Sequence, residues 1–188
     1  ARVIVWPDDT TRVHGSIQGR GGAHAGDGGF VETSGKRYLD ANGARVDASA
    51  VAGQGGQWLL DPSDLTIKAA GVDTTLSLLS PFLPGLLNSL LTLTTLQSAL
   101  NSGTSVILRT DGSGSGGTGN VVFDASAGAI DIVHTGTGGS TLTVDAFNDV
   151  VFSGGATSFR TQGGAGKDLQ GDLQARNRGR TSSGGSVS

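Results

Sequence analysis

The chain contains no cysteine and no methionine, only four prolines, and few charged residues among its 188 positions. Without cysteine it can have neither disulfides nor a cysteine-ligated zinc site. Charged residues make up 15% of the chain, against about 25% in average proteins. The net charge is −3, so the sequence lacks the basic excess typical of nucleic-acid-binding proteins. Hydrophobic residues reach 36%, which argues against a disordered chain.

What the chain has instead is many small, turn-forming residues. It contains 33 glycines, 20 serines and 19 threonines, without the three-residue glycine period of collagen. Short runs with alternating apolar residues stand between them, as expected of strands joined by tight turns. We predict strands at 2–6, 28–35, 37–41, 44–50, 57–61, 64–69, 105–110, 120–125, 129–134, 140–147, 149–154 and 157–161.

The later runs recur at an even spacing. Ile107, Ile130 and Val151 follow one another at nearly equal intervals along the chain. A period of roughly 20–24 residues with about three strands per repeat favours a parallel β-solenoid. The whole length would give roughly eight to nine coils, and fewer once the insertion and the tail are subtracted. An antiparallel sandwich also uses short strands at close spacing and is the alternative. In both cases the fold class is all-β.

Residues 74–104 differ from the rest because nine leucines lie between Leu76 and Leu93. The last part predicts a short helix packing on the solenoid, with Thr94 or Thr95 as N-cap and Gly103 at its C-terminal end. Two prolines and several polar residues argue against a transmembrane segment. The apolar residues before the helix are a candidate surface for self-association or a partner: Leu79, Phe82, Leu83, Leu86 and Leu87.

These features divide the chain into four parts. Residues 1–73 and 105–161 are predicted solenoid coils, and 74–104 is the leucine-rich insertion. Residues 162–188 are rich in glycine and serine, and they predict a tail or a partial extra coil. The chain starts with Ala1, and we expect it to be an internal piece of a longer protein.

Two long motifs carry a family resemblance. GGFVETSG at 28–35 and WLLDPSDLTI at 58–67 are similar to stretches of large bacterial exoproteins of the filamentous haemagglutinin and high-molecular-weight adhesin type. The segment TTLQSALNSGTSVILRT at 94–110 also resembles that family. The resemblance covers about residues 1–160, and within this range the insertion at 74–93 is the part least typical of the family.

The resemblance implies a right-handed parallel β-helix secreted by two-partner secretion through an outer-membrane transporter. It implies a rigid rod or fibre on the outer cell surface of a Gram-negative bacterium, which mediates adhesion. The partners would be flanking coils or neighbouring subunits, and a glycan or protein of host cells or matrix. The alternative is a β-helix carbohydrate-active enzyme or a polysaccharide-binding module.

The residues of the two motifs have structural interpretations. Gly28 and Gly29 predict a corner with unusual φ before a strand that starts at Phe30. The run Trp58, Leu59 and Leu60 predicts a strand covered on both faces, with one of the two leucines under the 74–103 segment. Asp61 and Pro62 then end the strand, and Asp64 caps the following turn.

Catalytic and metal-binding patterns are weak. The three histidines have no metal-ligand spacing, and GSGSG at 112–116 lacks the strand–turn–helix context of a nucleophile elbow. Asp8, Asp9 and Arg12 are candidates for a polysaccharide-cleaving site, but adjacent acids point to opposite sides of a strand. Hence we predict no enzyme activity and no cofactor. Asp27, Asp40, Asp47 and Asp61 are candidate ligands for calcium, through their carboxylates and turn carbonyls.

Overall fold

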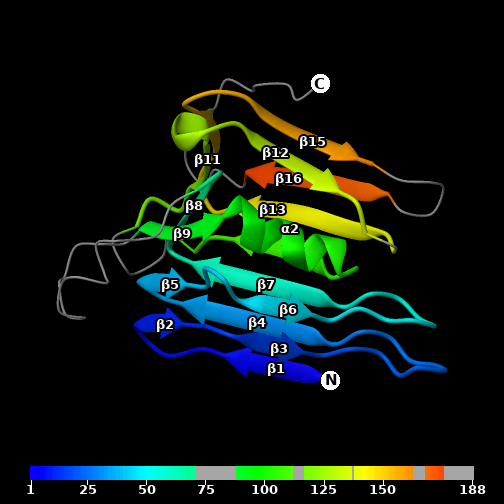
Figure 1. The fold of residues 1–188 in the computed structure, drawn as a ribbon. Coiled ribbons are helices and arrows are strands. Elements are labelled where there is room, and N and C mark those ends of the chain that lie inside the picture. Colours follow the sequence, from blue (N-terminus) through cyan, green and yellow to red (C-terminus); the bar gives the residue numbers. More distant parts are fainter. Residues whose placement is uncertain (71–87, 112–116, 137, 163–167, 176–188) are drawn as a thin grey trace.

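The computed structural model describes residues 1–70, 88–111, 117–136, 138–162 and 168–175. These residues form mostly β-strands, with one α-helix among them, so the all-β class is confirmed. Every strand pairing within the described residues is parallel. Figure 1 shows the strands stacked along one direction, with the N-terminus at one end of the stack.

Among the described residues the largest sheet has six strands, and their spatial order follows their order in the sequence (Figure 1). They are β1 (Arg2–Val5), β4 (Phe30–Gly35), β7 (Gln57–Pro62), β10 (Ser105–Arg109), β13 (Ser140–Ala146) and β16 (Leu169–Ala175). Between successive strands of this sheet the chain passes through the smaller sheets.

The repeat is longer than the sequence spacing predicted. The register pairs Arg2 with Phe30 and Ser140 with Leu169, and the repeat is longer still where the leucine-rich segment intervenes between β7 and β10. The predicted period was wrong because it compared strands of different sheets: Ile107 lies in β10 but Ile130 in β12 (Ile130–His134). The described part of the large sheet has six strands, which is consistent with the expectation of fewer than eight to nine coils once the insertion and tail are subtracted.

The smaller sheets flank the large one. The second sheet has the order β14-β11-β8-β9, and three further sheets pair β2 with β5, β3 with β6 and β12 with β15. The bounds are β2 Thr10–Arg12, β3 Ser16–Gln18, β5 Tyr38–Asp40, β6 Arg45–Asp47, β8 Asp64–Lys68, β9 Asn88–Thr92, β11 Val121–Asp124, β14 Val150–Ser153 and β15 Thr157–Thr161. A short 3₁₀ helix, η1, spans Ala125–Ala127.

Alternate side chains of the large sheet fill the interior. Val31, Trp58, Val106 and Leu142 form one inward row and are fully buried. The indole of Trp58 donates a hydrogen bond to the Thr33 hydroxyl at 2.9 Å, so its one polar atom is satisfied inside the core. Trp58, Leu59 and Leu60 are all buried, as the sequence predicted.

The helix α2 (Leu93–Asn101) packs on the core with one side and exposes Thr94 and Ser98 on the other. It buries Leu96, Ala99 and Leu100 in the same cluster as Trp58 and Leu60, and contacts both β6 and β12. Leu59 is also buried but, by strand alternation, faces the opposite side of β7. The N-cap is Thr92, slightly earlier in the chain than predicted, whereas Gly103 does follow the helix, with φ of +88°.

Strand β9 is an addition that the sequence did not predict. It follows β8 in the chain but pairs on the side of β8 away from β11. There it meets β5, where the Leu39 amide donates to the Ser89 hydroxyl at 2.9 Å. The candidate surface residues Leu79, Phe82, Leu83, Leu86 and Leu87 lie outside the described residues, as do Gly112–Gly116.

The corner at Gly28 and Gly29 requires glycine for a different reason than predicted. Neither residue has positive φ. A Cβ at Gly28 would overlap the Ala48 carbonyl oxygen and the Gly56 amide nitrogen, and one at Gly29 would crowd the Ala1 carbonyl. The glycines are therefore needed because neighbouring backbones approach too closely for a side chain.

Candidate functional site

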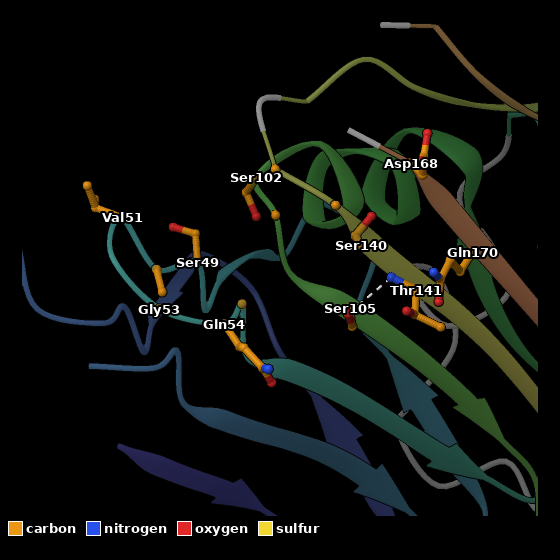
Figure 2. A pocket seen from close by; sticks show the side chains of 15 residues that line it. Ser49, Val51, Gly53, Gln54, Ser102, Ser105, Ser140, Thr141, Asp168 and Gln170 are labelled. Atoms are coloured by element: carbon orange, nitrogen blue, oxygen red, sulfur yellow. Dashed lines mark hydrogen bonds between the residues drawn. The ribbon is translucent and has the colours of Figure 1, made fainter. Parts of the chain in front are cut away.

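A polar groove of about 810 Å³ lies where the chain enters four neighbouring strands of the large sheet. One wall is the loop before β7, and the other is formed by the beginnings of β13 and β16 (Figure 2). The turn between α2 and β10 lies between them. The described lining residues are Ser49, Ala50, Val51, Gly53, Gln54, Gly55, Ser102, Gly103, Ser105, Gly138, Gly139, Ser140, Thr141, Asp168 and Gln170.

The first wall, the loop before β7, is fixed at its beginning by the Asp47 carboxylate. This carboxylate accepts hydrogen bonds from the Ser49 amide at 3.1 Å and the Ser49 hydroxyl at 2.7 Å, and pairs with Arg20 at 2.5 Å. Burial opposes ionisation, but the bonds from Ser49 and Arg20 outweigh it and lower the pKa of Asp47. The far end of the loop is fixed where the Gln54 amide donates to Asp27 at 2.8 Å.

The floor is fixed by close contacts between successive turns. The Ala48 amide donates to the Thr104 hydroxyl at 2.8 Å, and the Ser105 amide donates to the Gly56 carbonyl at 2.9 Å. The Thr141 amide donates to the Ser105 hydroxyl at 3.1 Å, as the dashed line in Figure 2 shows. These bonds tie the loops to one another, so the shape of the groove is set by the stack.

One row of polar side chains runs across the groove floor. Strand register places Ser105 beside Thr141, and Thr141 beside Gln170. Their sequence neighbours Val106 and Leu142 point into the core, so this row faces outward by alternation. Among the described lining residues, Asp168 is the only charged one. The groove thus offers hydroxyl and amide groups with little charge, and no pair of carboxylates from its described lining.

A second polar cluster lies on the outer face of the large sheet, around Asp61. Burial raises the pKa of Asp61 to about 6, against the attraction of Arg109, and the carboxylates Asp111, Glu32 and Asp145 raise it further. Arg109 itself pairs with Asp145 at 3.1 Å. The Arg109 guanidinium therefore interacts with two carboxylates, Asp61 and Asp145, and burial raises the pKa of Asp61 despite this attraction.

The four aspartates considered for calcium do not come together. Asp27 accepts a hydrogen bond from the Gln54 backbone amide at 2.8 Å. Asp40 accepts one from the Asn42 backbone amide at 3.2 Å. Asp47 binds Ser49 and Arg20, as described above. In the part of the chain that the structure describes, no three histidine or acidic side chains are placed to hold a metal ion.

The remaining candidates lie apart from the groove. Asp8 lies 3.7 Å from the Lys36 ammonium, and Asp9 lies 3.5 Å from Arg37. Both are exposed beside their cations, as Arg12 is exposed on β2. Asp64 does not cap its own turn. Its Oδ1 atom instead accepts hydrogen bonds from the backbone amides of Thr118 and Asn120, each at 3.0 Å.

Sequence reasoning missed both clusters. The groove is built from serine, threonine, glutamine and glycine, which look like turn residues until strand register places them together. A signal did exist, since Gly53–Gly56, Gly103 and Gly138–Gly139 each precede a strand of the large sheet. The acidic cluster was hidden because Glu32, Asp61 and Asp145 come from three separate strands.

The chain was compared with models of protein families and with curated proteins, and neither comparison found a match. Among the described residues, no helix is long and apolar enough to cross a membrane.

Proposed function

We propose that the chain is a right-handed parallel β-helix that forms a structural and adhesive segment of a secreted bacterial surface exoprotein. Its role is to build part of a rigid rod and to present polar surfaces to host cells, sibling cells or matrix. Under this proposal the exoprotein leaves the cell through an outer-membrane transporter, as the motifs at 28–35 and 58–67 imply by resemblance.

The observation that carries this proposal is the order of the large sheet. Six strands stack in sequence order, and each pairs in parallel with the strand one repeat earlier. Such a stack grows along one axis because each repeat contacts chiefly its neighbours. This arrangement suits a rod whose length depends on the number of repeats.

The adhesive role is tested with coated beads. Beads carrying the chain are added to epithelial cell layers and to purified biofilm polysaccharide, and retained beads are counted after washing. We expect more retention than with beads carrying an equal amount of serum albumin. Equal retention on every surface contradicts an adhesive role, and leaves a spacer that only extends the rod.

A carbohydrate-active enzyme is the second candidate, and the Asp61 cluster is the observation that favours it. A buried carboxyl group with a raised pKa is a common form of general acid, and further carboxylates lie on adjacent strands. The test is release of reducing ends from a panel of polysaccharides, for the native chain and Asp61→Asn. Activity that the substitution abolishes supports the enzyme, and absence of activity on the whole panel counts against it.

A further inference from the structure

We propose that the polar groove binds a segment of a linear, uncharged polysaccharide that lies along the stacking direction. This inference rests on the adhesive function proposed above and assigns it a site and a class of ligand. It concerns the loops before β7, β10, β13 and β16, which are separate from the Asp61 cluster.

The shape of the groove favours an extended polymer. Its lining comes from four strands that are neighbours in the sheet. Parallel strands lie about 4.8 Å apart, so the floor is about 15 Å long from the first of these strands to the last. A volume of about 810 Å³ falls within the range of small-ligand sites, which is roughly 300–1,000 Å³. The groove therefore accommodates several sugar units of a chain.

The chemistry of the floor favours hydroxyl groups. Ser105, Thr141 and Gln170 present two hydroxyls and a carboxamide in one outward row along the stack. Gln54 is exposed on the opposite wall. Hydroxyls and carboxamides both donate and accept hydrogen bonds, which matches a ligand whose hydroxyl groups do the same.

The charge of the groove distinguishes among polymers. Its described lining holds no lysine or arginine, and Asp168 adds one negative charge. Sulfated or uronate-rich chains need cationic partners, so they fit poorly. An apolar peptide also fits poorly, because Ala50 and Val51 are the only apolar side chains of the described lining. A neutral polysaccharide satisfies both conditions.

The rigid floor lowers the cost of binding. The Ser105 hydroxyl accepts a hydrogen bond from the Thr141 amide. The turn before Ser105 is fixed by the hydrogen bond from the Ala48 amide to the Thr104 hydroxyl. A Cβ at Gly55 would overlap the Gly103 carbonyl, so the two turns are in direct contact. Little conformational entropy is then lost when a ligand arrives.

The test uses the whole chain and isothermal titration with cellohexaose, maltohexaose and mannohexaose, with hexagalacturonate and a heparin hexasaccharide as charged probes. The groove variant is Thr141→Val with Gln170→Leu. The matched control is Thr143→Val with Gln174→Leu, which changes the same two strands on the same face outside the groove lining. A third variant, Gly138→Trp, fills the groove from a position where a Cβ meets nothing within 4 Å.

We expect at least one neutral hexasaccharide to bind the native chain and the control equally. The groove variant should bind it about tenfold more weakly, since two lost hydrogen bonds amount to that factor, and Gly138→Trp should abolish binding. The inference is overturned if no neutral probe binds, if only charged probes bind, or if the two double variants bind alike. Bead retention distinguishes the two hypotheses. If the beads adhere but no hexasaccharide binds, the groove is not the binding site, whereas the adhesive function still stands.

Discussion

At the scale of single residues, Gly28 shows how closely the repeats are packed. Its missing side chain allows the Ala48 carbonyl and the Gly56 amide to approach. Both are backbone atoms, so they cannot rotate away as a flexible side chain would. We expect Gly28→Ala to lower the free energy of unfolding in urea by about 2–3 kcal/mol, as overpacking does.

Gly138→Ala is the control for that substitution. Gly138 also precedes a strand of the large sheet, but a Cβ there meets nothing within 4 Å. Its φ is not positive, so alanine should change stability by less than about 0.5 kcal/mol. If the two alanine variants unfold at the same urea concentration, close backbone approach at Gly28 is not the reason for glycine.

Asp61 gives the chain a pH dependence of unusual sign. Burial raises the pKa of Asp61 to about 6 in the folded chain, from 3.8. A group that binds its proton more tightly when folded adds stability as pH falls through that window. We therefore expect the free energy of unfolding to be higher at pH 4.5 than at pH 7.5. The difference is on the order of 2–3 kcal/mol.

The variant Asp61→Asn isolates this effect. It should raise stability at pH 7.5 and flatten the curve between pH 4.5 and 7.5, measured by urea unfolding. Asp172→Asn, on an exposed position of β16, removes the same charge and should keep the slope. A native chain that is less stable at pH 4.5 than at pH 7.5 contradicts the assignment.

The increase in the free energy of unfolding at acidic pH must reverse in stronger acid. A hydrogen bond from Ser126 lowers the pKa of Asp124 to about 2, and one from Arg160 does the same for Asp131. Groups with lowered pKa values contribute stability above 3.8 and lose it as pH falls towards 2. The stability maximum should therefore lie near pH 4–5.

At the scale of elements, α2 is a structural part of the core. Leu96 is fully buried, and the helix contacts β6 on one side and β12 on the other. We expect Leu96→Ala to cost about 2–5 kcal/mol, because it leaves a cavity between layers that cannot collapse. Ser98→Ala, on the exposed side of the same helix, should leave the urea midpoint within error. A helix that only covers the surface would show equally small effects at both positions.

The sequence was sufficient for elements with strong alternation and insufficient for the others. Strands such as β7 and β13 were predicted because their inward residues are apolar and bulky. Strands β2 (TTR) and β3 (SIQ) hold too few apolar residues to show alternation. Strand β16 reads LQGDLQA, so its sequence did not decide between a tail and an extra coil. Strand β9 was hidden inside a leucine run. The groove could not be predicted because register, rather than composition, brings its residues together.

At the scale of the whole molecule, the stack is uneven along its length. On the side of the second sheet, β9 adds a strand between β5 and β8, whereas in the large sheet β4 is followed directly by β7. On the next side, α2 takes the place between β6 and β12. A helix is about 10 Å wide and a strand spacing is about 4.8 Å. The extra material on two sides therefore requires local bending of the stack at this level.

A stack of this kind should open from its ends. Trp58 and Val106, on the inward faces of β7 and β10, are fully buried, whereas Val3 on β1 and Leu173 on β16 are only partly buried. Each end strand of the large sheet also pairs with one neighbour, and inner strands pair with two. Because stability in a stacked array is shared between neighbours, opening the ends exposes less apolar surface than opening the middle.

Hydrogen exchange measured on the isolated chain by mass spectrometry tests this gradient. Amides of β7 and β10 should exchange slowest, and amides of β1 and β16 should exchange at least about tenfold faster, which corresponds to roughly 1.4 kcal/mol. Leu96→Ala should speed exchange in β6 and β12 on either side of α2 more than in β1. Uniform protection from β1 to β16 would mean that the chain unfolds as one unit, and that the end strands are as firmly held as the centre.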